Sequence, residues 1–131
     1  MTDSYLTVSA DVTAALAHTE LRADDPLVHA ALEFAARPWL DGVHTGAEAM
    51  AWGDFATAVQ AVADDLFTGA SPHVLPSRPA QPSAELTAAA IALTSATADV
   101  FARAAARPGE ARAWQFSAAA AQLAEAAASL P

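Results

Sequence analysis

Alanine occupies 39 of the 131 positions, and this abundance restricts the folds open to the chain more than any other feature. Alanine has the highest helix propensity and carries little side-chain area, so it favours helices that pack close together. Ile and Tyr are sparse, and no two-residue alternation of apolar and polar side chains appears, which argues against an all-β fold. We therefore predict an all-α protein.

The chain length suits one domain, so we expect residues 1–131 to form a single antiparallel bundle of four to five helices. The first helix begins at Leu6 or Ser9 and ends at Leu21. The third, fourth and fifth helices are expected to form the frame, and the first two complete the bundle.

Prolines mark both ends of the predicted second helix. Asp25 is a natural N-cap, because Pro26 at the first helical position loses no hydrogen bond. Pro38 lacks the N–H that a helix interior needs. We therefore expect a kink or break near Pro38, followed by a short piece over residues 39–43.

Residues 45–48 read Thr-Gly-Ala-Glu, the spacing of a capping box, and predict a third helix that ends near Gly69. Its large apolar side chains recur at alternating steps of three and four. They are Trp52, Phe55, Val59, Val62 and Leu66. Four Pro in the loop at about 70–82 then favour extended backbone, either as a plain connection or as a docking segment.

Two further helices follow this Pro-rich loop. Ser83 caps the fourth, which runs to about Arg107 with an apolar stripe on one face: Leu86, Ala90, Leu93, Thr97, Val100 and Ala104. The fifth spans about Glu110–Ser129 and carries two series with a spacing of seven. One series is Ala113, Ala120 and Ala127, and the other is Phe116, Leu123 and Leu130.

The acidic groups are unevenly placed. Residues 1–69 carry eleven acidic groups and two Arg, whereas residues 70–131 carry four of each sign. Nucleic acids and anionic lipids both require clustered cations, so we expect neither as a partner. The acidic half suits a solvated surface or a docking surface for a basic partner.

Other features bear on location and source. The N-terminus lacks the pattern of a signal peptide, and the uncharged stretches 86–98 and 113–124 are shorter than the roughly 20 residues that span a bilayer. We therefore expect a cytoplasmic protein. A lysine-free composition rich in Ala is typical of a GC-rich genome and favours a bacterial source.

Five titratable residues are candidates for chemistry: His29, Glu33, Asp41, His44 and Glu48. Bundle-type dimetal proteins use Glu-x-x-His pairs from facing helices, and this chain has no such pair. It also has no Cys to supply a thiolate. We predict no metal and no cofactor. A metal- or acid/base-dependent enzyme of a specialised bacterial pathway, built on these five residues, is the alternative function.

Large aromatic rings are the strongest indication of binding. The predicted ligand-binding residues are Trp39, His44, Trp52 and Trp114, because an Ala-rich bundle offers small neighbours that do not absorb such rings fully. The alternative, which is the more common case, is that the three Trp rings are buried anchors of the domain's own core. The hydroxyl-rich run 94–97 is more typical of side chains that bond to their own helix carbonyls. We therefore predict a non-catalytic binding protein whose partner is a second copy, another protein or an apolar small molecule.

Overall fold

The computed structural model describes residues 2–131 and confirms the all-α prediction. Over these residues the chain forms five helices and no strand. They are α1 (Tyr5–Leu16), α2 (Pro26–Leu40), α3 (Gly46–Leu66), α4 (Ala84–Ala105) and α5 (Ala113–Ser129). Ser4, Asp25 and Ser83 each cap a helix through the side-chain oxygen, the latter two as predicted. The capping box expected at residues 45–48 does not form, since the Thr45 side chain makes no capping hydrogen bond.

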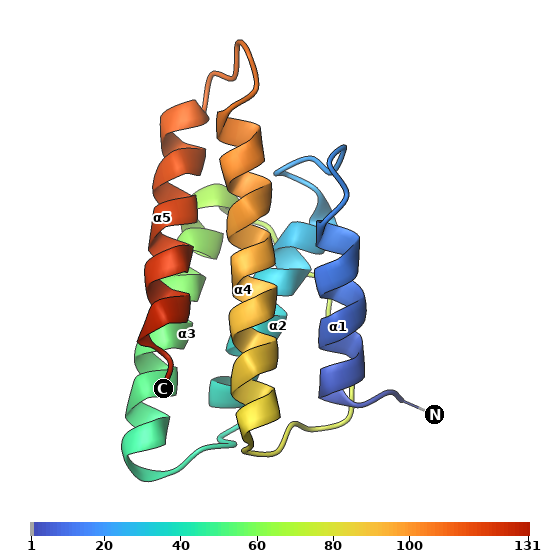
Figure 1. The fold of residues 1–131 in the computed structure, drawn as a ribbon, viewed down its shortest axis with the longest axis vertical. Helices are drawn as coiled ribbons and strands as arrows, with labels where there is room; N and C mark the ends of the chain where they lie inside the picture. The colour runs from blue at the N-terminus through green and yellow to red at the C-terminus, as the bar shows by residue number, and fades with distance from the viewer. Residues whose placement is uncertain (1) are drawn as a thin grey trace.

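The helices form a ring of four with a fifth helix outside it. Figure 1 shows α1, α3 and α4 running in one direction and α2 and α5 in the other. α2, α3, α5 and α4 contact one another in that cyclic order, so every neighbouring pair is antiparallel, and α1 packs outside against α4 and α2. The bundle prediction is confirmed, with α5 placed between α3 and α4, which occupy diagonal positions.

The topology explains the length of the Pro-rich segment 70–82, which is non-helical as predicted. α3 and α4 point the same way, so the chain has to return along the whole bundle between them. Thirteen extended residues at about 3.1 Å each reach about 40 Å, enough to pass a helix of about 33 Å. Arg37 of α2 holds the segment by donating to the carbonyl of Leu75, and the Arg78 N–H donates to the carbonyl of Asp3.

Helix α2 continues through Pro38 and ends two residues later, so the predicted break lies after the proline rather than at it. In a regular helix the N–H of residue 38 bonds the carbonyl of Phe34, and proline has no N–H. That carbonyl instead accepts a hydrogen bond from the hydroxyl of Tyr5, whose ring stacks on Phe34 with centroids 4.2 Å apart. Burial raises the pKa of Tyr5, so its hydroxyl stays protonated and donates.

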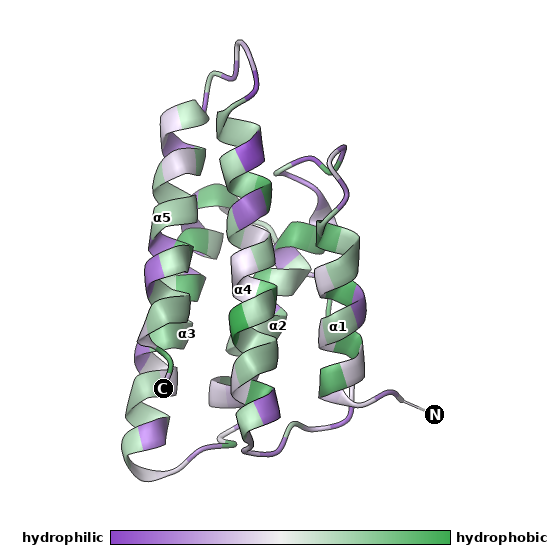
Figure 2. Ribbon diagram, in the orientation of Figure 1, coloured by the Kyte–Doolittle hydropathy of each residue, from purple (hydrophilic) through white to green (hydrophobic). Residues whose placement is uncertain are grey.

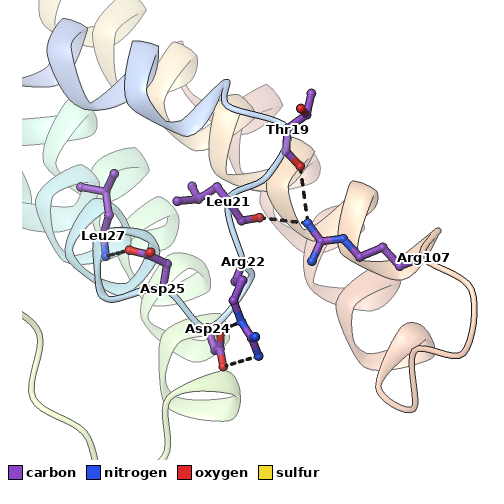
Figure 3. A network of polar contacts seen from close by, with 7 residues as sticks. All are labelled: Thr19, Leu21, Arg22, Asp24, Asp25, Leu27 and Arg107. Carbon is purple, nitrogen blue, oxygen red and sulfur yellow. Dashed lines mark hydrogen bonds and ion pairs between the residues drawn. The ribbon is translucent and has the colours of Figure 1, made fainter.

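Helix α1 ends at Leu16, five residues earlier than predicted, and two arginines bind the chain there: Arg103 in the last turn of α4, and Arg107 just after that helix. Arg103 donates to the Leu16 carbonyl at 2.8 Å. Arg107 donates to the carbonyls of Thr19 and Leu21 at 3.5 and 3.2 Å (Figure 3). The last carbonyls of a helix have no partner inside it and carry partial negative charge, so cations stabilise them. The arginines thus bind carbonyls at the end of α1 and in residues 17–21, which the prediction had placed in a longer helix.

Apolar side chains from all five helices form one buried cluster. The predicted stripe of α4 is buried throughout, and in the α3 seam only Leu66 is half-buried. In α5 the large residues Phe116, Leu123 and Leu130 are buried as predicted, but Ala113 and Ala120 are only half-buried. The buried alanines are Ala119, Ala126 and Ala127. α5 contacts α3 as well as α4, so its buried face is wider than the heptad series implies.

Helix α4 is long and apolar enough to cross a membrane by length and composition alone. In the structure its apolar stripe faces the other helices and forms part of the core, and Figure 2 shows apolar residues along all of α4. A core helix of a soluble bundle meets the same criterion, and the contacts of α4 with α1, α2 and α5 account for its composition.

The Tyr5 hydrogen bond generates the first prediction. Tyr5→Phe should lower the free energy of unfolding by about 1–3 kcal/mol, because the buried Phe34 carbonyl loses its donor. In a Pro38→Ala background the same substitution should cost close to nothing, since residue 38 then supplies an N–H to that carbonyl. Urea unfolding of the wild type, the two single variants and the double variant measures this double-mutant cycle. An equal loss of unfolding free energy in both backgrounds would contradict the pairing of Tyr5 with the Phe34 carbonyl.

Candidate functional site

The turn between α2 and α3 carries His44 onto the side of Trp52. Gly42 and Gly46, on either side of the histidine, both have positive φ, at 69° and 61°, which other residues rarely adopt. The two glycines thus shape the turn that directs His44 inward. Its ring stacks on Trp52 with centroids 4.5 Å apart and an interplanar angle of 15°. Trp52 in turn meets Phe55 edge to face at 5.5 Å, so a chain of aromatic rings leads from the turn into the core.

His44 and Trp52 line a cavity of about 410 Å³, which we name the His44 cavity. It lies at the end of the bundle where α3 and α4 begin. Apolar and polar side chains share its walls. The apolar ones are Trp52, Pro82, Ala84 and Pro131, and the polar ones are His44, Glu48, Ser83 and Thr87. A cavity of this volume with a few convergent polar groups is typical of a small-molecule site.

The histidine is the one buried polar side chain of this cavity, since 8% of its surface is exposed. Its Nδ1 is sealed from solvent and has no hydrogen-bond partner within residues 2–131, whereas Nε2 is not sealed. Burial lowers the pKa of His44 below its ordinary value, against a smaller opposite effect of the Glu48 carboxylate. The ring is therefore neutral at pH 7. A buried N–H without an acceptor is costly, so we infer that the proton resides on Nε2.

The two remaining predicted ligand-binding residues, Trp39 and Trp114, lie at different ends of the molecule. The indole of Trp39 lies against α3 at Gly53, where a Cβ atom would come within 2.8 Å of Nε1. Trp39 is 39% exposed and flanks the turn of α3 that carries Trp52, so it shares this corner of the bundle. Trp114 is 76% exposed at the start of α5, which is the opposite end of the molecule. The structure thus brings together His44 and Trp52, places Trp39 against the neighbouring Gly53 outside the cavity lining, and separates Trp114 from all three.

The five residues proposed for the alternative enzyme lie in separate places. His44 and Glu48 line the His44 cavity, His29 and Glu33 line a second cavity between α2 and α3, and Asp41 is exposed. In the described part of the chain no group of three His, Asp or Glu residues is placed to hold a metal ion.

Several cavity residues had no signal in the sequence. Ser83 and Thr87 reach the His44 cavity only because α4 begins beside the α2–α3 turn, and Gln60 and Asp64 reach the second cavity because α2 packs on α3. No spacing along the chain joins them to the histidines. The hydroxyl-rich run behaves as expected at Thr97, which bonds the carbonyl of Leu93 at 2.8 Å.

The two buried histidines predict a pH dependence. Burial lowers the pKa of both His29 and His44, so the unfolded chain binds more protons than the folded chain near pH 6. The free energy of unfolding should therefore fall as the pH decreases from 7 to about 5.5. Urea unfolding across this range measures the slope, and replacing both residues by Gln should flatten it. An unchanged slope in the double variant would refute this assignment.

No family model, no curated protein and no solved structure matches this chain.

Proposed function

We propose that the protein is a non-catalytic, cytoplasmic binding protein whose His44 cavity holds an apolar small molecule with a hydrogen-bond acceptor. The observation that carries the proposal is the buried, neutral imidazole of His44 on the wall of a cavity of about 410 Å³. Because the Nδ1 atom of this ring is sealed, its Nε2–H is the group that can donate to a bound molecule.

The lining supports this class of ligand. Trp52, Pro82 and Pro131 offer apolar surface, while the Nε2–H of His44 offers a donor to a carbonyl or ether oxygen. Ser83 accepts from the N–H of Leu86 at 3.0 Å through its oxygen, so its own hydroxyl proton is left to donate to the same acceptor. The Glu48 carboxylate beside these donors disfavours an anionic ligand.

A matched pair of probes tests the proposal. Acetophenone carries a carbonyl acceptor, and ethylbenzene has a similar size without one. We expect acetophenone to shift the His44 ring and Trp52 indole resonances saturably and to bind more tightly than ethylbenzene; the Trp52 resonances report binding where His44 is replaced. His44→Phe keeps the stack on Trp52 but removes both nitrogens, so the preference for acetophenone should fall about tenfold, the equivalent of one hydrogen bond of about 1.4 kcal/mol.

The control is His73→Phe, which changes an exposed histidine of the Pro-rich segment and should leave the preference as in the wild type. If His44→Phe retained the wild-type preference, or if neither probe shifted the His44 resonances, the proposal would be wrong.

A second candidate function is supported by the surface beside this cavity. Trp39 and Met50, which is 74% exposed, lie on the same side of α3, because Met50 is three residues before the Gly53 that Trp39 covers. Asp54 is four residues after Met50 on that side, and α3 carries four carboxylates and no Arg. Exposed apolar side chains with an acidic border fit a basic amphipathic segment of a partner protein.

A peptide of alternating Leu and Lys in helical register tests this second function. We expect it to bind the wild type, with Trp39→Ala combined with Met50→Ala weakening binding about tenfold and Trp114→Ala changing it less than twofold. A peptide with Glu in place of Lys should not bind. If Trp114→Ala weakened peptide binding equally, the attraction would be non-specific. If the protein without peptide formed a stable dimer that buries Trp39, the partner of this surface would be a second copy of the chain.

A further inference from the structure

A second cavity, of about 320 Å³, lies between α2, α3 and the beginning of the Pro-rich segment. We name it the His29 cavity. Its polar walls are His29, Glu33, Gln60 and Asp64, and its apolar walls include Leu32 and Pro72. It shares no lining residue with the His44 cavity, so the two cavities can bind different ligands independently.

His29 is fixed in this cavity. Only 8% of its surface is exposed, and one face of the ring stacks on Phe67 with centroids 4.5 Å apart and planes within 8°. No hydrogen bond from residues 2–131 contributes to its pKa, which burial lowers. The ring is therefore neutral at pH 7, and one of its two nitrogens carries a lone pair that can accept a hydrogen bond in the cavity.

The two carboxylates of the cavity differ in their partners. The Glu33 carboxylate is paired with Arg37 at 2.6 Å, and the same Arg37 also donates to the Leu75 carbonyl. Asp64 is exposed at the mouth of the cavity and forms no ion pair within the described residues. Both carboxylates act electrostatically on His29, but burial opposes its protonation, so the ring does not supply the missing positive charge.

We infer that the His29 cavity binds a small organic cation with a primary ammonium group. An ammonium has three N–H donors, and the cavity offers three kinds of acceptor for them: the Asp64 carboxylate, the His29 nitrogen and the Gln60 amide oxygen. The alkyl part of such a ligand contacts Leu32 and Pro72. A metal ion fits less well, because no three His, Asp or Glu side chains of residues 2–131 are arranged to coordinate one.

The Pro-rich segment forms the outer wall of this site. Pro72 borders the cavity, and the bond from Arg37 to the Leu75 carbonyl holds the next residues against α2. Gly69, with φ of 76°, provides the turn by which the chain leaves α3. Arg37 therefore does two things at this site: it neutralises Glu33 and fixes the wall. This leaves Asp64 as the carboxylate that determines the preference for a cation.

The test uses n-butylammonium chloride as the probe, with n-butanol and sodium chloride as controls. The readout is the ring resonances of His29 in a proton–carbon correlation spectrum, with those of His44 as an internal reference. We expect n-butylammonium to shift the His29 resonances saturably and to leave the His44 resonances unchanged. n-Butanol and sodium chloride at equal concentration should leave the His29 resonances in place.

Asp64→Asn should weaken n-butylammonium binding about tenfold, because it removes the charge and keeps the shape. Asp54→Asn, an exposed carboxylate of the same helix outside the cavity, should change binding less than twofold. Gln60→Leu provides a second variant that should also weaken binding. Three results would overturn the inference: equal n-butylammonium affinity in the Asp64 and Asp54 variants, a shift of the His29 resonances by sodium chloride alone, or no shift of them by n-butylammonium. The outcome at His44 does not change this conclusion.

Discussion

The hydrogen bond from the Tyr5 hydroxyl to the Phe34 carbonyl is the contact on which the arrangement of the α2–α3 corner depends. Pro38 leaves that carbonyl without its helical donor, and a buried carbonyl without a partner is costly. α1 supplies the donor and at the same time packs its aromatic ring on Phe34. α2 can therefore run two residues past the proline before the chain turns, and this places Trp39 against α3 and His44 against Trp52.

Other polar groups of the bundle connect its parts in the same way. Arg103 binds the last carbonyl of α1, Arg107 binds a carbonyl of the chain after it, and Arg37 binds both Glu33 and the Pro-rich segment. Because these arginines are engaged in holding connections, they do not neutralise the acidic groups of α3. The surface of that helix thus keeps an excess negative charge, and each of the two histidine cavities has a carboxylate from α3 in its wall.

The two cavities share one design. In each, a histidine from α2 or its following turn stacks at 4.5 Å on an aromatic ring at one end of α3, is 8% exposed, and has a pKa that burial lowers. They differ in what surrounds the ring. His44 faces apolar walls with hydroxyl groups nearby, which suits a neutral molecule. His29 faces an unpaired carboxylate and an amide, which suits a cation.

Helix propensity, capping and periodicity act between residues a few positions apart, so the helices, the caps at Asp25 and Ser83 and most of the buried stripes follow from local sequence. It also singled out His44 and Trp52, which the structure stacks against each other. Tertiary structure alone decided where α1 ends, how α2 passes Pro38, and which alanines of α5 are buried. It likewise decided that Trp114 lies apart from the other aromatic residues and that Asp64 joins His29 in one cavity. These outcomes depend on contacts between helices distant in sequence, and no local pattern encodes which carbonyl an arginine or a tyrosine from another helix will reach.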